Sequence, residues 1–357
     1  MKKPEPPRTH KWLRTDRPPE ATPLLPELHA RIPGGVAPEA AELAHAIRAA
    51  LVGWPIVILR VVGRVEGRLQ LGRHPGRWVR AEIGRIVDER MCICDGPRCT
   101  RDDCWAGSLL GRHGKGPKPE GEAWAPFTVR AAEMPEGNIT ERGNIKFELV
   151  FAGWSAIEQI PSLVRALQDP PPPPYGAGTI TWTAIHALRV DEDGDPRWKK
   201  VDLDGPPPLF PLDRVSEPRV RRGRLTLTFL TATPIALQGE QGTPTAELSL
   251  VVDRMSRSFG AWMGRTGHRG PRLPVEGMLK AAAAATLAAD NSRPVEVPGM
   301  LLGAAGSRED MDARTASLIG SITWKGDFSG LAPLLVAAHY IGMGPGRQHA
   351  LGQIVIR

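Results

Sequence analysis

One order of elements occurs twice in this 357-residue chain, and it constrains the fold more than any other feature. In each copy a strand and a helix lead to a tyrosine, a glycine-rich turn and a further strand. The first copy covers residues 144–188 and contains Tyr175; the second covers 318–357 and contains Tyr340. These are the only two tyrosines of the chain. A repeated order of this kind favours a duplicated unit over a single irregular domain.

The parts that precede each copy also match. A β-branched, apolar run over 54–65 is followed by a helical pattern over 78–90, as the strand pattern over 224–230 is followed by a helical pattern over 245–263. Each half therefore predicts a βαββαβ unit, the ferredoxin-like order. We expect an α+β protein with two tandem ferredoxin-like domains of the kind also found in RNA-recognition modules.

These patterns divide the chain into four parts. We expect an N-terminal arm and short helix over 1–51, a first domain with a cysteine-rich insertion over 52–204, a linker over 205–223, and a second domain with a glycine-rich loop over 224–357. Within the second domain, residues 267–310 are interpreted as an insertion with its own helix.

Composition limits the class of protein. Lys and Arg number 46 against 39 Asp and Glu, a net charge of +7, which is compatible with a polyanionic partner. No apolar run approaches the length of a membrane span, and the first residues lack the apolar stretch of a secretory signal. We therefore expect a cytoplasmic protein with no membrane partner, and the oligomeric state stays open.

All four cysteines lie close together in the sequence. They are Cys92, Cys94, Cys99 and Cys104, within the run MCICDGPRCTRDDCW. In a reducing compartment such clustering indicates a metal site rather than disulfides, and four thiolates suit a closed, structural zinc. An iron–sulfur cluster and free thiols remain alternatives. A catalytic zinc is disfavoured, because no open set with His or carboxylate ligands lies nearby.

Two groups of residues are candidates for binding phosphates. The first consists of the closing glycine turn with its arginine, namely Gly342, Gly344, Gly346 and Arg347. Glycines let a backbone approach an anion closely, although an ordinary turn has the same composition. The second group consists of arginines, namely Arg214, Arg219, Arg221, Arg222 and Arg224 near the linker and Arg265, Arg269 and Arg272 further along the chain. They could follow an RNA backbone or form a solvated surface.

At this point the sequence resembles a known family, from about Trp54 onward. The runs that carry the resemblance are PGRWVRAEIGRIVDERMCICDGPRCTRDDCWAGSLLG, LTLTFLTATPIAL and SLIGSITWKGDFSGLAPLLVAAHYIGMGPGRQHALGQIVIR. They are similar to the CRISPR-associated endoribonucleases of the RAMP superfamily, the sixth Cas protein family, which cut precursor CRISPR RNA within its repeats. The resemblance implies CRISPR repeat RNA as the substrate and other Cas proteins as partners.

The implied reaction needs no cofactor for catalysis. The ribose 2′-hydroxyl attacks the neighbouring phosphate and leaves a 2′,3′-cyclic phosphate and a 5′-hydroxyl, which requires a base, an acid and positive charge on the phosphate. The resemblance makes His74 the first candidate for the catalytic histidine, because the family often carries one between the first strand and the first helix; His349 and His45 are alternatives. Arg77 and Arg80 are candidates for stabilising the transition state, and Tyr340 either donates a hydrogen bond or packs.

Two other functions remain open at the level of the sequence. One is a non-catalytic RAMP subunit that binds crRNA within a CRISPR effector complex. The other is a small-molecule enzyme on a ferredoxin-like scaffold, since a fold by itself does not fix a function. No cofactor motif supports the second of these.

Overall fold

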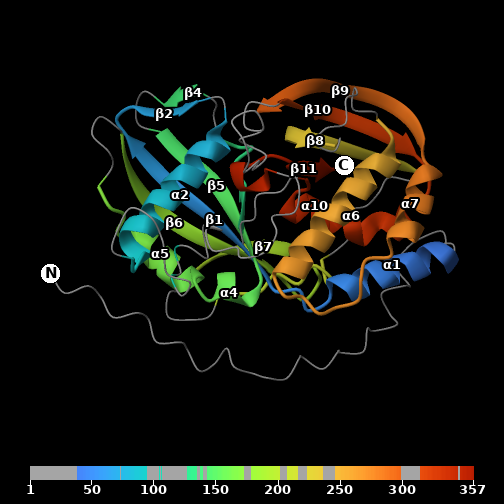
Figure 1. Ribbon diagram of the computed structural model, residues 1–357, viewed down its shortest axis with the longest axis horizontal. Helices are drawn as coiled ribbons and strands as arrows, with labels where there is room; N and C mark the ends of the chain where they lie inside the picture. Colours follow the sequence, from blue (N-terminus) through green and yellow to red (C-terminus); the bar gives the residue numbers. More distant parts are fainter. Residues whose placement is uncertain are drawn as a thin grey trace. The chain divides into compact units, whose positions relative to one another are not determined.

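The computed structural model gives the arrangement of most of the chain (Figure 1). The residues that it describes are 38–72, 74–94, 104, 106, 127–134, 137–139, 143–172, 178–201, 207–215, 223–235, 246–298, 314–344 and 346–357. In this part the protein mixes helices with two antiparallel sheets and one short pair of strands. None of the helices in these ranges is long and apolar enough to cross a membrane.

The helices are interspersed among the strands along the chain. They are α1 (Pro38–Leu51), α2 (Pro75–Met91), α4 (Trp154–Ile157), α5 (Ile160–Gln168), α6 (Leu248–Arg265), α7 (Val275–Ala283) and α10 (Ala332–Ile341), with the 3-10 turns η3 (Ser329–Leu331) and η4 (Arg347–His349). The short pair of strands is β2 (Leu69–Gly72) with β4 (Gly137–Ile139).

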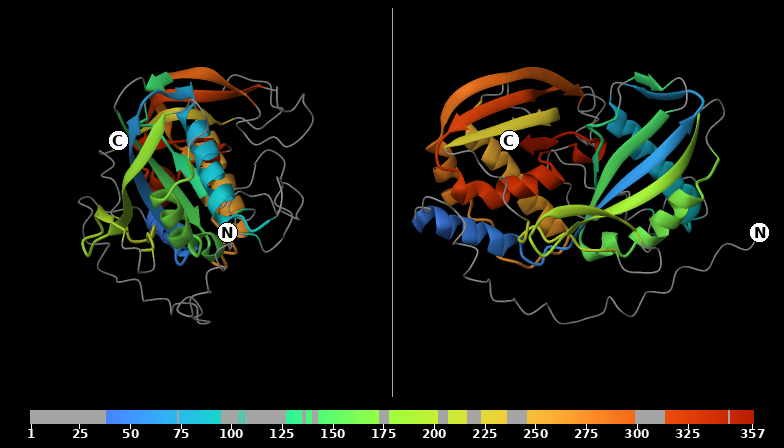
Figure 2. Two further views of the ribbon diagram at one scale, coloured as in Figure 1. Left: turned by 90° about the vertical axis from the view of Figure 1, so that its left-hand side faces the viewer. Right: turned by 180° about the vertical axis from the view of Figure 1, so that it is seen from behind.

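The first sheet comes from the first half of the chain. In spatial order its strands are β3 (Phe127–Arg130), β5 (Gly143–Ala152), β1 (Ile56–Glu66), β6 (Thr179–Val190) and β7 (Pro196–Lys200). Every neighbouring pair is antiparallel, and Leu59 of β1 lies opposite Leu149 on one side and Ala187 on the other. The alternating residues Val57, Leu59 and Val61 belong to the core that also contains α2 and α5. Both helices cover one face of this sheet (Figure 2).

The second sheet comes from the second half. In spatial order its strands are β11 (Ile354–Ile356), β8 (Arg224–Pro234), β10 (Arg314–Lys325) and β9 (Thr286–Pro298), again all antiparallel. Leu227, Ile322 and Trp324 share a core with residues of α6 and α10. This core also includes Ile56 and Ile58 of β1, so the first sheet contributes its second face to the packing of the other half.

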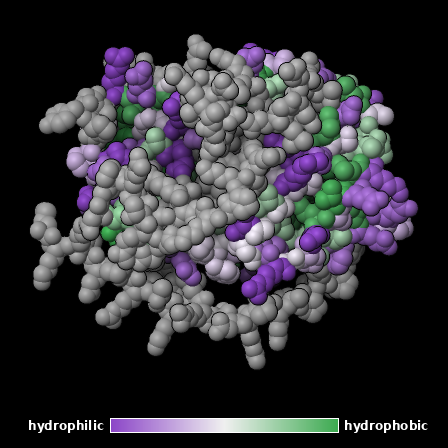
Figure 3. Space-filling model, viewed as in Figure 1, coloured by the Kyte–Doolittle hydropathy of each residue, from purple (hydrophilic) through white to green (hydrophobic). Residues whose placement is uncertain are grey.

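The structure corrects one expectation in the second half. The region 267–310 was expected to be an insertion with its own helix; α7 is such a helix, but 286–298 forms β9, a strand of the sheet paired along β10. Most of β9 is exposed, because it lies at the sheet edge, and its sequence lacks the alternation of a half-buried strand. In Figure 3 the surface of the described residues contains both hydrophilic and hydrophobic areas, with a hydrophobic area on the side of α6 and α7.

Candidate active site

The N-cap and the first two turns of α2 carry three of the candidate residues. His74 occupies the N-cap position and Pro75 follows as the first helical residue, a place that suits proline because its missing N–H would have no helical partner. The backbone N–H of Arg77 donates a 2.9 Å hydrogen bond to the carbonyl of His74. Arg80 comes one turn further along. The first peptide N–H groups of a helix favour a negatively charged ligand, and two arginines strengthen that preference.

The glycine-rich loop (residues 342–352) joins α10 to β11. Gly342, Gly344 and Gly346 have φ angles of 74°, 75° and 76°, which side chains with a Cβ seldom adopt. The two ends of the loop are held together, since the N–H of Met343 donates to the carbonyl of Gly352 at 2.9 Å. A Cβ on Gly352 would collide with the carbonyl oxygen of Met343. The glycines are therefore required by the closed shape of the loop.

The loop contacts the start of α2 through Gly76. A Cβ at this position would collide with the carbonyl oxygen of His349 and the Cβ of Ala350. Sequence analysis did not single out Gly76. No signal in the sequence marked it, because the helical pattern begins at residue 78 and Gly76 lies in the turn before it. Its absent side chain lets the backbone of the loop approach the helix.

His349 shares an electrostatic environment with the start of α2. Burial, together with the nearby Arg80, Arg77 and His74, lowers the pKa of His349 to about 4. At neutral pH the imidazole of His349 is therefore uncharged. The structure thus brings together His74, Arg77 and Arg80 from the first half with His349 from the second, although 275 positions separate the two histidines in the chain (349 less 74).

Arg347 takes a different place from the one expected of a phosphate ligand. Only 8% of the residue is exposed, and its guanidinium lies 4.6 Å from the ring centre of Trp262 on α6. Stacking of this kind fastens the glycine-rich loop to α6. Two further residues connect the loop to both cores: Met343 belongs to the core of the second sheet and Ala350 to that of the first.

Other candidates lie apart from this cluster. Arg224 is exposed at the start of β8, whereas the glycine-rich loop reaches the far end of that strand, where the N–H of Gly352 donates to the carbonyl of Ala232. Eight residues of extended strand separate the two points by about 26 Å. His45 is exposed on α1. Arg214 is exposed before β8, and Arg219, Arg221 and Arg222 lie outside the described residues.

Tyr340 belongs to a second polar cluster, which sequence analysis did not identify. Its carbonyl accepts a 3.0 Å hydrogen bond from Nη1 of Arg130, and its ring packs against Phe210. Glu148 binds Nη1 of Arg130 at 3.0 Å and Nη2 of Arg60 at 2.7 Å. The cluster ties three strands of the first sheet to the end of α10, immediately before the glycine-rich loop. Burial raises the pKa of the Tyr340 hydroxyl, so it remains protonated at neutral pH.

Because two histidines are buried, we expect the free energy of unfolding to fall in acid. Burial lowers the pKa of His339 and of His349 to about 4, against 6.5 in an unfolded chain. Between pH 6.5 and 4 the unfolded chain binds more protons, so the free energy of unfolding falls as the pH falls through this window. The full loss is on the order of 3 kcal/mol for each histidine.

Urea denaturation at several pH values measures this effect. The variant His339→Gln should show a shallower fall in unfolding free energy between pH 6.5 and 4 than the wild type. His45→Gln, at an exposed position on α1, is the control and should reproduce the wild-type slope. An identical slope in His339→Gln and the wild type would contradict the assignment of a neutral, buried His339.

Three of the four cysteines form a compact cluster at the end of α2. Cys92, Cys94 and Cys104 have sulfur atoms that all lie within 4.8 Å of one another, and this group could hold a metal ion. The sulfurs of Cys92 and Cys104 are 3.7 Å apart, so they form no disulfide. Burial raises the pKa of the Cys92 thiol. Cys99 lies outside the described residues.

The sequence and the fold differ in how far they match known proteins. No family model matches the sequence, and no curated protein matches it either. A Thermus thermophilus Cas6 protein has a TM-score of 0.50 at 16% identity, over 85% of this chain and 99% of its own. The same protein in a product complex gives 0.50 at 16% identity, over 84% and 99%. This chain has the fold of the Cas6 proteins.

A larger assembly contains the Cas6 fold as well. A partial Cas6–RT–Cas1–Cas2 complex includes a chain with a TM-score of 0.53 at 11% identity, over 86% of this chain and 47% of that one. At such identities the likeness concerns architecture. The activity therefore depends on the residues that this Cas6 fold brings together.

Proposed function

We propose that the protein is a CRISPR repeat-specific, metal-independent endoribonuclease that cleaves precursor crRNA. The observation that carries the proposal is the convergence of His74, Arg77 and Arg80 at the start of α2 with His349 of the glycine-rich loop. Cleavage by an internal hydroxyl needs a proton acceptor and fixed positive charge beside one phosphate, and this cluster supplies both. The likeness to a Cas6 product complex supports the same assignment.

Each residue has a distinct part in the proposed reaction. His74 accepts the proton of the 2′-hydroxyl, whose oxygen then forms a bond to phosphorus. Arg77 and Arg80 stabilise the charge on the phosphorane oxygens, together with the backbone N–H groups at the start of α2. The bond to the 5′ oxygen breaks, and that oxygen takes a proton from solvent. The imidazole of His349 is uncharged near neutral pH. The backbone carbonyl of His349 orients the cluster through its contact with Gly76.

The strand orders support a pair of ferredoxin-like RAMP domains. In each half, the first strand lies between the last and the third, and the second strand lies outside the third. The orders are β6-β1-β5-β3 in the first sheet and β11-β8-β10-β9 in the second. These orders are those expected of a βαββαβ unit, and we propose that the chain uses such a unit twice, with β7 added at the edge of the first sheet. We place the domains at 52–204 and 224–357, with 205–223 as the linker.

The proposed partners are the CRISPR repeat RNA and other Cas proteins. A net charge of +7 favours binding to RNA, and the arginines at the start of α2 offer positive charge to its phosphates. The known structure of a Cas6–RT–Cas1–Cas2 complex supports the association with other Cas proteins.

A cleavage assay in EDTA tests the function directly. The purified protein is incubated with labelled RNA containing its own repeat, and the products are separated and their ends identified. We expect one cut per repeat, with a 2′,3′-cyclic phosphate and a 5′-hydroxyl. Tight, salt-sensitive binding without a cut would instead indicate a RAMP subunit that holds crRNA. A cut that requires added magnesium would contradict the proposed chemistry.

A further inference from the structure

The cysteine cluster has the dimensions of a site for a single metal ion. With metal–sulfur bonds of about 2.3 Å, two thiolates of a tetrahedral zinc lie about 3.8 Å apart. The sulfurs of Cys92 and Cys104 are 3.7 Å apart, and that of Cys94 lies within 4.8 Å of both. An iron–sulfur cluster needs wider spacing, because several irons and sulfides occupy the space between its thiolates. The geometry therefore favours one ion held by soft ligands, which is the preference of zinc.

The surroundings of the cluster match a closed, structural site. Cys104 is fully buried within the core of the first sheet, and Cys92 and Cys94 pack against that core. No described His, Asp or Glu side chain joins the three sulfurs to make an open catalytic set. Sequence supplies a fourth thiol, Cys99, between Cys94 and Cys104, although this residue lies outside the described part of the chain.

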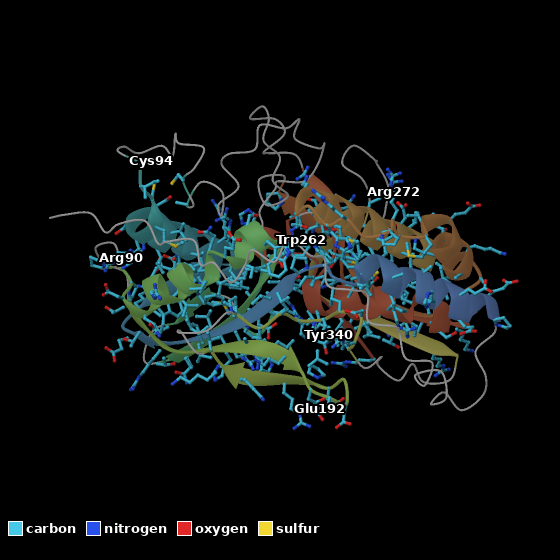
Figure 4. All side chains as sticks on the ribbon, turned by 90° about the horizontal axis from the view of Figure 1, so that it is seen from below. Arg90, Cys94, Glu192, Trp262, Arg272 and Tyr340 are labelled. Atoms are coloured by element: carbon cyan, nitrogen blue, oxygen red, sulfur yellow. The ribbon has the colours of Figure 1, made fainter. Side chains whose placement is uncertain are left out.

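An ion bound to these cysteines would hold the end of α2 in place, because Cys92 caps that helix. Cys92 is the C-cap of α2, with its N–H donating to the carbonyl of Val87 at 3.1 Å. Figure 4 shows Cys94 at this end of the helix, beyond Arg90. Arg90 already ties the last turn to the carbonyl of Asp169, which follows α5. Cys104 comes from the long connection that leads from α2 to β3.

We propose that Cys92, Cys94 and Cys104 bind a structural zinc ion that holds Cys104 against the end of α2. Such an ion stabilises the folded state, because it binds the native arrangement and closes a long loop. The ion takes no part in cleavage. This inference does not depend on the proposed function, since none of its tests uses RNA.

Metal analysis of the purified protein is the first test. We expect about one zinc ion per chain in the wild type, the same content in Ile93→Val, and less than a tenth of it in Cys92→Ser or Cys94→Ser. Ile93 lies between two ligands but offers no ligand atom, so its variant is the matched control. Folded wild-type protein that contains no zinc after growth in zinc-supplemented medium would overturn the proposal, as would stoichiometric iron with sulfide.

Cobalt replacement keeps the test independent of whether the variants fold. Wild-type protein loaded with Co²⁺ in place of zinc should show thiolate-to-metal charge-transfer absorption and the intense visible bands of a tetrahedral ion. Weak visible bands without charge transfer would mean that oxygen or nitrogen ligands hold the metal elsewhere, which contradicts the site.

Hydrogen exchange tests the mechanical role. When a mercurial displaces the zinc, amides in the last turns of α2 should lose protection, while those of α6 in the other half should keep theirs. Unchanged protection of α2 in metal-free protein would show that the ion does not hold the helix. Because this readout uses no substrate, a failure to cleave RNA would leave it intact, and the two proposals fail separately.

Discussion

Replacement of His74 by alanine is expected to lower the rate of repeat-RNA cleavage by about 10²–10⁴-fold, the usual contribution of a positioned acid or base. The affinity for the repeat should change little, because Arg77, Arg80 and the glycine-rich loop remain in place to bind phosphates. The loss should appear in single-turnover rates measured with saturating enzyme, where binding does not limit the reaction. His74 lies at the N-cap of α2 without a side-chain cap to the helix, so the substitution removes no capping bond.

The control for this experiment is His45→Ala. His45 is an exposed histidine on α1 and was an alternative candidate in the sequence, so the variant tests whether any histidine loss would act equally. It should cleave at the wild-type rate. A wild-type rate in His74→Ala, or an equal loss in His45→Ala, would contradict the assignment of His74 as the base. The thermal melting temperature of each variant shows whether the fold is kept.

Replacement of Gly76 by alanine is expected to have the second large effect. The added Cβ has no room, because the carbonyl of His349 and the Cβ of Ala350 occupy its place, and both belong to the backbone-held loop. The loop must therefore shift away from α2. We expect a loss of about 1–3 kcal/mol in unfolding free energy and a fall of about 10²-fold in cleavage, the usual cost of an ångström of misplacement.

Gly260→Ala is the matched control. Gly260 lies on the exposed side of α6, and a Cβ there meets no atom within 4 Å. A glycine-to-alanine change at such a helical position should stabilise the protein by about 0.4–1 kcal/mol and leave cleavage unchanged. If Gly76→Ala behaved like Gly260→Ala in both urea denaturation and cleavage, the contact between loop and helix would have no functional importance.

The two predictions separate chemistry from positioning. His74→Ala removes a proton acceptor and should keep stability and binding. Gly76→Ala keeps every polar group and should lose stability, cleavage and some RNA affinity together. Observing the same profile in both variants would show that the start of α2 acts only as a structural element.

Local patterns in the sequence predicted much of the fold. The helix expected over 78–90 is α2 (Pro75–Met91), and the strand expected over 224–230 lies within β8 (Arg224–Pro234). The helix expected over 245–263 corresponds to α6 (Leu248–Arg265). Such elements were predictable because each buries one face, and burial imposes a period of two or 3.6 residues on the sequence. The order of these elements then follows from their positions in the sequence.

β9 was missed for the converse reason. An edge strand with exposed residues on both faces has no period to detect, and its backbone hydrogen bonds to β10 depend on a partner elsewhere in the chain. The same limit applies to Arg347. Its place in the glycine-rich turn made it a candidate phosphate ligand, and only the structure shows that it packs against Trp262 of α6.

By itself, then, the sequence determined the duplicated order of elements, the clustering of the cysteines and the presence of a histidine between the first strand and the first helix. Only the tertiary structure decided that His349 meets that helix and that Glu148 ties Arg60 and Arg130 beside the end of α10. The reason is physical: spacing along the chain governs local hydrogen bonds and burial, while contacts between distant residues depend on how two cores pack against each other. The small size of Gly76 matters only because the glycine-rich loop packs against it.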